Sequence, residues 1–323
     1  MVDEASVGIV TVTYNSSDVI IPFVECLLTQ TYKRLRLYAV DNASSDGTVS
    51  RLLQYQDGRI SVIANRENVG VAEGNNEGIR AALADGCDYV LLINNDTEFG
   101  PSLLEQMMVA LRDSDCDMIA PKILFFDNQQ MIWSAGGGFS APKGYLGFHY
   151  GLGEMDRGQF DAARIVENAP TCCLLVRRSV FERIGLMDGR YFVYLDDADF
   201  CFRAARAGLK LFYCPSVKLF HKVGSLTGGP SSEFNVRFCT RNHIFFILKN
   251  LGLCRALYYL PAYQIRLIFK LLSQRIDTAG FLLREAAFVE GLRIWRSSLR
   301  NGFASRPSGG PPNASAANST PSL

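Results

Sequence analysis

Three groups of polar side chains have the types and the spacing to do chemistry, and each stands where an apolar run ends. They are Asp41-Asn42 with Asp46, the run Asn94 to Glu98, and the acidic cluster Asp196 to Asp199. Carboxylate and amide oxygens are ligands that Mg²⁺ or Mn²⁺ prefers, and they can also read the edge of a uracil or thymine base and the hydroxyls of a ribose. The sequence therefore predicts a nucleotide site, with a divalent cation bridging two phosphates beside the second group.

Each group taken by itself has a simpler explanation. Asp41 and Asp46 could form an Asx turn and a helix N-cap, and a single acid at a strand end, such as Asp96, is usually a turn residue. Asp196 and Asp197 could merely begin a helix, where the helix dipole favours acidic side chains. The residues alone leave these alternatives open.

Composition and loop chemistry disfavour several classes of protein. The connection Thr13 to Ser16 has no glycines where a dinucleotide fingerprint needs them, and the chain has no GxxxxGK[ST] loop, which disfavours dehydrogenases and P-loop NTPases. A net charge of +1 gives no general reason to expect nucleic acid as a partner. The 9 Cys residues form no CxxC pair and the N-terminus does not resemble a signal peptide, so we expect reduced thiols and a cytoplasmic protein.

Alternating strands and helices must position the first two groups. Four β-branched apolar runs each precede an amphipathic run, which predicts an α/β fold: a mostly parallel sheet with helices on both faces and the ligand beyond the carboxyl ends of the strands. The side chains of Asn15 to Asp18 are expected to cap the first helix. The predicted strands are residues 7–14, 35–41, 60–63 and 89–93, and the predicted helices are residues 19–29, 45–55, 73–84 and 101–112.

The following part of the chain is less regular. The Gly-rich and aromatic residues 125–150 predict an irregular subdomain with short strands. Regular structure is expected again at residues 172–176 and 191–195, before a helix that runs from Asp197 and ends at the capping Gly208. Two short strands are expected after it, at residues 210–213 and 216–220.

Two or three helices are predicted within residues 255–300, and the Pro-, Gly- and Ser-rich residues 301–323 should be disordered. Residues 257–272 are nearly all apolar or aromatic, but Pro261 and basic residues interrupt them, and they fall short of the roughly 20 residues of a membrane span. Residues 281–299 mix apolar side chains with arginines, which suits an anionic membrane surface. Packing on the core and dimerisation are the alternatives.

Several motifs occur in the order and at the spacing of a known family. Over about residues 6–250 the chain resembles family 2 glycosyltransferases of the GT-A fold, in particular their rhamnosyltransferase-like branch. The resemblance implies a Rossmann-like catalytic domain at residues 1–250, with a nucleotide-binding half (1–125) and an acceptor half (126–250), and amphipathic helices at 251–300. The motifs are Val10 to Asn15, Val40 to Thr48, Asn68-Val69-Gly70, Leu92 to Asp96, Arg177 to Phe181, Gly185 to Asp188, Leu195 to Phe200 and Arg241-Asn242.

The resemblance implies roles for single residues. Asp197 matches the family's catalytic base, and Asp196 and Asp199 are expected to orient the acceptor or a loop. The residues expected to hold the nucleotide sugar are Thr13, Tyr14, Asn15, Asp41, Asn42, Asp46, Asn68, Gly70, Asn75, Asn95 and, near the diphosphate, Arg241.

The metal motif departs from the family pattern. Asp96 matches the last residue of the family's Asp-x-Asp motif, but the first position is Asn94. Because the substitution removes one negative charge, further ligands matter more, and His221 is expected as one of them. Thr171 to Cys173 stand where relatives usually have a glycine and a small residue, so the fit of the sugar could differ.

The implied function is an inverting, metal-dependent sugar transfer from a dTDP- or UDP-sugar, with rhamnose as one option, to a hydroxyl of a glycan or lipid-linked glycan during cell-surface polysaccharide biosynthesis. The expected cofactor is Mg²⁺ or Mn²⁺. Residues 255–300 offer peripheral contact with the inner face of the cell membrane. Two alternatives remain: a sugar nucleotidyltransferase, which would normally have a Gly-rich basic first loop, and an inactive glycan-binding protein, which only Asn94 favours.

Overall fold

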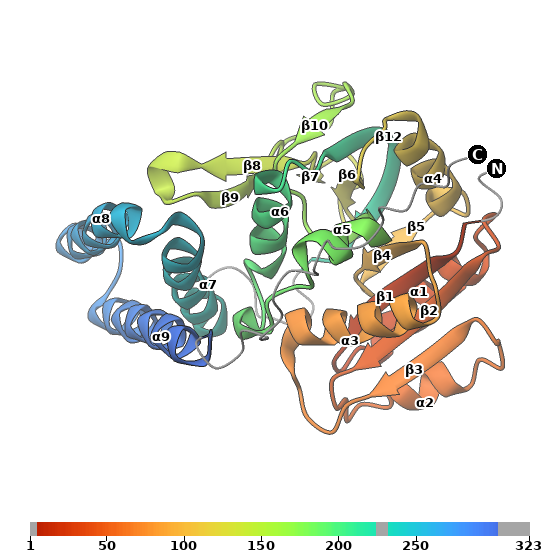
Figure 1. Cartoon of the computed structure of the whole chain (residues 1–323), viewed down its shortest axis with the longest axis horizontal. Coiled ribbons are helices and arrows are strands. Elements are labelled where there is room, and N and C mark those ends of the chain that lie inside the picture. The colour runs from red at the N-terminus through yellow and green to blue at the C-terminus, as the bar shows by residue number, and fades with distance from the viewer. Residues whose placement is uncertain (1–4, 224–231, 303–323) are drawn as a thin grey trace, which may run out of the picture.

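The computed structural model describes residues 5–223 and 232–302 and shows one large twisted sheet with helices on both faces (Figure 1). The strands are ordered β10-β12-β6-β11-β4-β1-β2-β3. The predicted fold class is confirmed. The first elements are β1 (Val7–Thr13), α1 (Ser17–Leu28), β2 (Leu35–Asp41), α2 (Thr48–Leu53), β3 (Ile60–Ala64), α3 (Gly70–Ala84), β4 (Tyr89–Ile93), β5 (Thr97–Phe99) and α4 (Leu103–Asp113).

The second half of the sheet is mixed. β1 pairs in parallel with β2 and β4, and β6 pairs in parallel with β12, but β11 lies antiparallel between β4 and β6. These later elements are β6 (Met118–Phe125), β7 (Ile132–Ser134), β8 (Gly137–Ser140), β9 (Leu146–His149), β10 (Arg164–Val166), β11 (Cys173–Arg177), α5 (Arg178–Ile184), α6 (Asp196–Arg206) and β12 (Leu211–His221).

The core has two layers because the sheet is apolar on both faces. Phe23 of α1, Leu52 of α2 and Met107 of α4 belong to the cluster on one face. Ile79 of α3 and Phe200 of α6 belong to the cluster on the other. Successive residues of each strand alternate between these layers, so the sheet is held from both sides and its carboxyl ends are rigidly placed.

Two predictions about regular structure were wrong. Residues 191–195 are no strand: a 3₁₀ turn at Gly189–Tyr191 is followed by positive φ at Phe192, Tyr194 and Leu195. The two short strands expected at 210–213 and 216–220 are one strand, β12, with a register shift between Cys214 and Lys218. Pro215 lies at that irregularity, where a residue without an N–H group is tolerated.

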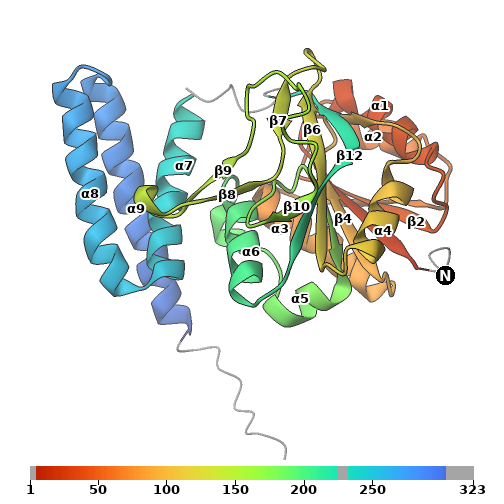
Figure 2. The ribbon, with the colours of Figure 1, turned by 90° about the horizontal axis from the view of Figure 1, so that it is seen from above.

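The C-terminal helices project from the sheet and its flanking helices as a separate layer, with α8 on the outer side of α9 (Figure 2). They are α7 (Glu233–Phe246), a π-helical turn (Ile247–Leu251), α8 (Leu253–Leu272) and α9 (Thr278–Gly302). Two residues of the expected tail belong to α9, and 303–323 lie outside the described residues, as does the loop 224–231. None of the helices in the described part of the chain is long and apolar enough to span a membrane.

Candidate functional site

The register of the sheet brings the ends of neighbouring strands together. Thr13, the last residue of β1, lies opposite Asp41, the last residue of β2. On the other side, Thr97 at the start of β5 lies opposite His221 at the end of β12. The first pair marks the predicted nucleotide end of the site, and the second marks the predicted metal end.

Asp41 orders the turn that follows β2. Its carboxylate is 2% exposed and accepts hydrogen bonds from Thr13 Oγ1 at 2.8 Å and from the Ser44 amide at 2.9 Å. Between them, Ala43 adopts φ 60°. The carboxylate therefore makes the turn contact that was the simpler explanation for it, while its contact with a ribose stays a prediction.

Asp46 caps two helices. Its Oδ2 accepts from the Ser17 amide at 2.8 Å, and its Oδ1 accepts from the amide and hydroxyl of Thr48 at 3.1 and 2.6 Å. Although burial raises the pKa of Asp46, these hydrogen bonds outweigh it and lower the pKa to about 2. The predicted cap of α1 by its own preceding side chains was wrong, because Ser16 makes no capping hydrogen bond.

The other residues predicted for the nucleotide sugar line or support the same edge. Asn95 Nδ2 donates to Val12 O at 3.0 Å, which ties the end of β4 to β1. Asn42 Nδ2 donates to Gly70 O at 3.1 Å, and Asn68 Oδ1 accepts from the Gly70 amide at 2.9 Å. The remaining members are Asn15, which accepts from the Ser45 amide at 2.9 Å, the buried Asn75 and Tyr14, which is 42% exposed at the rim.

The two predicted metal ligands lie side by side. Asp96 Oδ1 is 3.2 Å from His221 Nε2. The edge of the His221 ring packs against Trp133, with the ring centroids 4.5 Å apart, and Trp133 also contacts His149 at 5.0 Å. No group of three or more His, Cys, Asp or Glu side chains in ligating arrangement occurs within residues 5–223 and 232–302. The protein therefore offers a partial ligand set.

Trp133 and His149 were not predicted as site residues. Burial lowers the pKa of His149 to about 4, so its ring is neutral at neutral pH. The only sequence signal for this aromatic support was the irregular, aromatic-rich segment 125–150, which does not indicate which ring faces His221. The contact needs β7 and β9 to fold back over the end of β12.

The acidic cluster opens α6 and contains a coupled pair. Burial and, to a smaller extent, the charge of Asp197 raise the pKa of Asp196 to about 8. Burial also raises the pKa of Asp197, although the Ala198 amide donates to its Oδ1 at 2.7 Å. Asp196 Oδ2 is buried and has no hydrogen-bond partner among the described residues. The two carboxyl groups therefore titrate as a pair, in which burial and mutual repulsion favour a single negative charge.

Cys172 lies beside the end of β4, because its carbonyl oxygen accepts from the Asn94 amide at 3.1 Å. Burial raises the pKa of its thiol well above the usual range, and the charges of Asp96 and Asp197 raise it further. Burial likewise raises the pKa of Cys239, on α7, to about 11, with Asp197 again contributing. The charges of Asp96 and Asp197 both act on Cys172, which indicates that the two candidate groups share one neighbourhood.

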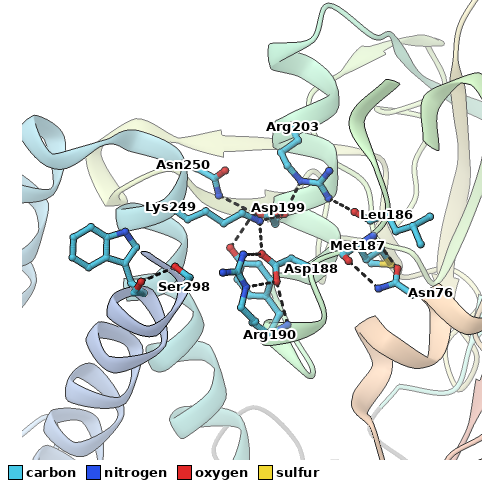
Figure 3. Close-up of polar contacts among 12 residues, drawn as sticks. Asn76, Leu186, Met187, Asp188, Arg190, Asp199, Arg203, Lys249, Asn250 and Ser298 are labelled. Atoms are coloured by element: carbon cyan, nitrogen blue, oxygen red, sulfur yellow. Dashed lines mark hydrogen bonds and ion pairs between the residues drawn. The ribbon is translucent and has the colours of Figure 1, made fainter. Parts of the chain in front are cut away.

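Asp199 lies in an internal ion-pair cluster. It is completely buried, and Lys249, Asn250 and Arg203 converge on it (Figure 3). The distances from its carboxylate to their nitrogen atoms are 2.7 to 2.9 Å. Tyr191 also donates to it at 3.0 Å. Of the two roles predicted for Asp199, this geometry supports the ordering of a loop.

Arg241 is committed to protein contacts. Its guanidinium donates to the carbonyl oxygens of Arg190 and Tyr191, and its Nη1 is 3.5 Å from Glu290 Oε1. Burial lowers the pKa of Arg241, and only the Glu290 charge opposes this. Protein groups already accept most of the N–H groups of Arg241, and its contact with the diphosphate stays a prediction.

Gly70 allows the loop before α6 to approach α3. It has φ +85°, and an added Cβ would lie 2.5 Å from Phe192 O. We expect Gly70→Ala to lower the free energy of unfolding by about 2 to 4 kcal/mol, from the left-handed φ and the clash together. Chemical denaturation would measure the change.

Gly86→Ala is the matched control for Gly70→Ala. Gly86 has φ +80°, and nothing lies within 4 Å of an added Cβ. The control should therefore show the cost of the backbone conformation without the clash. If both variants lose the same free energy of unfolding, Phe192 can shift at little cost to make room for the added Cβ.

Comparison with known proteins shows the family of the chain. The model of the family described as Glycosyl transferase family 2 matches residues 8–185, more than half of the chain. A low-salt glycan biosynthesis hexosyltransferase of Haloferax volcanii is 29% identical over 64% of this chain and 67% of its own length. An N-acetylglucosaminyl-diphospho-decaprenol L-rhamnosyltransferase of Mycobacterium tuberculosis is 26% identical over 77% of this chain and 86% of its own.

Solved structures share the fold at low sequence identity. The mannosyltransferase PcManGT from Pyrobaculum calidifontis, in complex with GDP-Man and Mn²⁺, superimposes with a TM-score of 0.53 at 16% identity and covers 94% of this chain and 89% of its own. GalNAc-T7 with UDP, GalNAc and Mn²⁺ has a TM-score of 0.61 at 13% identity, over 93% of this chain and 58% of its own. With the family match, the chain belongs to glycosyl transferase family 2 and is a glycosyltransferase of the hexosyltransferase class, with relatives in the rhamnosyltransferase-like branch.

Proposed function

We propose that the chain transfers a sugar, with inversion, from a dTDP- or UDP-sugar to a hydroxyl of a glycan or lipid-linked glycan in cell-surface polysaccharide biosynthesis. Rhamnose is the first sugar to test, because relatives in Mycobacterium tuberculosis and Shigella flexneri are named for rhamnosyl transfer. The observation that carries the proposal is that the Asp96–His221 pair and the Asp196–Asp197 pair share the neighbourhood of Cys172.

Asp197 is the base of the proposed reaction. In an inverting transfer, one group takes the proton of the acceptor hydroxyl as its oxygen attacks the anomeric carbon opposite the leaving diphosphate. Burial raises the pKa of Asp197, which makes its carboxylate a better proton acceptor than an exposed one. Because both carboxyl groups of the Asp196–Asp197 pair are raised in pKa by burial, one negative charge on the pair is favoured over two.

Asp96 and His221 would hold a divalent cation, and the residues present fit it in part. One carboxylate and one imidazole are few ligands for Mn²⁺ or Mg²⁺, so oxygens of the donor's diphosphate must complete the set. Such a cation neutralises charge on the departing diphosphate. The Mn²⁺ in the mannosyltransferase and GalNAc-T7 structures supports this assignment.

A panel of donors tests the proposal. Purified protein would be incubated with dTDP-, UDP- and GDP-sugars, with Mn²⁺ or with EDTA, and with a lipid-linked glycan extract as acceptor. Release of nucleoside diphosphate from one donor, only with metal and acceptor present, is the expected result. Release that does not depend on the acceptor would indicate hydrolysis of the donor instead of sugar transfer. Formation of a sugar nucleotide from a sugar phosphate would support the nucleotidyltransferase alternative.

We further propose that α8 rests on an anionic membrane surface. Six of its exposed apolar side chains fall in a stripe about 120° wide at the helical period of 3.6 residues, with Leu253 outside it, and its basic side chains, Arg255, Arg266 and Lys270, lie along one border. Leu253–Leu272 contains no acidic residue. An apolar stripe bordered by positive charge is the pattern that binds acidic lipid headgroups. The stripe comprises Leu257, Tyr258, Ile265, Ile268, Phe269 and Leu272, which are 47% to 78% exposed.

Replacing two residues of this stripe should weaken vesicle binding. We expect the double variant Leu257→Ser with Phe269→Ser to bind phosphatidylglycerol vesicles at least tenfold more weakly than the unaltered protein, since each change removes on the order of 1 kcal/mol of buried apolar surface. Sedimentation with vesicles would measure it. Leu53→Ser is the control, because Leu53 is 65% exposed on α2, away from the C-terminal helices.

Neutral vesicles and light scattering separate the alternatives. The unaltered protein should bind phosphatidylcholine vesicles much less than anionic ones, and 1 M salt should release it. If instead it binds no vesicle and forms a dimer that the double variant breaks, the stripe is a dimer interface and the membrane proposal is wrong.

A further inference from the structure

The loop that leads into Asp196 has an unusual backbone. Phe192 has φ 65° and ψ −62°, and the Val193 amide donates to Tyr191 O at 2.8 Å, which is the rare, strained form of γ-turn. Tyr194 and Leu195 follow with φ 64° and 60°. Three large side chains with positive φ within four residues are costly, and such a loop persists only where its surroundings hold it in place.

One buried amide group holds most of this loop. Asn242, on α7, is completely buried, and its Nδ2 donates to the carbonyl oxygens of Tyr191, Val193 and Tyr194 at 2.9, 2.7 and 2.8 Å. Its Oδ1 accepts from Arg241 Nε at 2.8 Å, which fixes the orientation of the amide. A single side chain thus holds carbonyl groups on both sides of the γ-turn.

The neighbours of Asn242 complete the support. Arg241 donates to Arg190 O and Tyr191 O, and Glu290 of α9 pairs with its guanidinium. From the opposite side, Phe192 O accepts from the Ala72 amide at 3.3 Å in the first turn of α3. The loop is therefore clamped between α3 and α7, and the hydrogen bonds of the Asn242 side chain go to this loop and to Arg241.

We propose that Asn242 is a positioning residue for sugar transfer: it fixes the strained loop 191–195 and so places the carboxylate of Asp197 at the acceptor hydroxyl. This rests on the proposed function. The loop enters α6 directly at Asp196 and Asp197, so a change in its backbone moves the start of that helix. Displacement of a catalytic group by about 1 Å is enough to lower a rate about 100-fold.

Asn242→Asp tests the proposal because it leaves the shape of the side chain almost unchanged but removes its N–H donors. A carboxylate has only acceptor oxygens, which cannot hydrogen-bond to the three carbonyl oxygens. We expect kcat to fall about 100-fold, while the KM for the donor and the affinity for the nucleoside diphosphate change less than twofold. Hydrogen exchange, measured by mass spectrometry, should accelerate in the amides of residues 191–197. Asn235→Asp, the same change near the start of α7, is the control and should affect neither quantity.

The two measurements separate the possible failures. Unchanged exchange in residues 191–197 of Asn242→Asp would overturn the clamp whether or not a donor has been found. Faster exchange with an unchanged kcat would overturn the positioning role. Parallel losses of kcat, donor affinity and thermal stability would also contradict it, since they would show a merely structural residue. If no donor supports turnover by the unaltered protein, the proposed function fails, and the exchange result alone decides the clamp.

Discussion

Asp197→Asn should lower kcat by roughly 10³-fold, because the amide cannot accept the proton of the attacking hydroxyl. The KM for the donor should stay within a few-fold, since Asp197 is expected to act on the acceptor hydroxyl and not on the nucleotide of the donor. Steady-state kinetics with the donor identified in the panel would measure both. The fold should be unaffected, because an Asn side-chain oxygen can accept the hydrogen bond from the Ala198 amide as well as the Asp197 carboxylate does.

The pH profile gives the same prediction a second readout. The base works only as a carboxylate, so activity is lost as the pH falls through its pKa, which burial raises above the ordinary Asp value of 3.8. The acidic limb of kcat should therefore lie at a higher pH than for an exposed Asp, and it should be missing from the residual activity of Asp197→Asn.

Asp115→Asn is the matched control for the base. Asp115 is exposed at the end of α4 and has φ 49°, a conformation that Asn adopts readily. It should leave kcat and the pH profile unchanged. A loss in Asp197→Asn of less than tenfold, with an acidic limb like that of the unaltered protein, would show that another group takes the proton.

The sequence predicted the parallel half of the fold and the ends of its strands. Thr13 and Asp41 could be paired in advance, because both end apolar runs in a repeated strand–helix unit. Asp96 and His221 are 125 positions apart, yet family resemblance suggested their proximity and the pairing of β5 with β12 shows it. The local pattern and the family motifs were sufficient to predict the position of a residue where it lies at the end of a strand.

Prediction failed where tertiary contacts override local preference. β6 contains Pro121 and Lys122, which argue against a central strand, but Lys122 is fully buried and its Nζ is 3.0 Å from Asp156 Oδ1. The aromatic run Tyr191–Leu195 reads as a strand, yet Asn242, some 50 residues later, holds it in a turn. Neither partner is near in sequence, so no local pattern could have revealed these contacts.

Asp96→Ala should lower kcat/KM by roughly 10³-fold, since charge stabilisation by a bound cation is worth several kcal/mol and each 1.4 kcal/mol corresponds to tenfold. EDTA should lower the activity of the unaltered protein as strongly, and added Mn²⁺ should restore it. The variant should stay inactive in Mn²⁺, because its ligand, rather than the metal, is missing. Asp113→Ala, which removes an exposed carboxylate at the end of α4, is the control.

Asn94→Asp makes the metal prediction quantitative. The change restores a second carboxylate two residues before Asp96, and affinity for a hard cation rises with the number of charged ligands. The Mn²⁺ concentration that gives half-maximal activity should therefore fall several-fold, while the maximal rate changes little. If Asp96→Ala stays active in EDTA, the cation has no role and His221 must act on the diphosphate directly. If Asn94→Asp leaves the Mn²⁺ dependence unchanged, residue 94 does not face the cation, and the neutral side chain found there costs the enzyme no metal affinity.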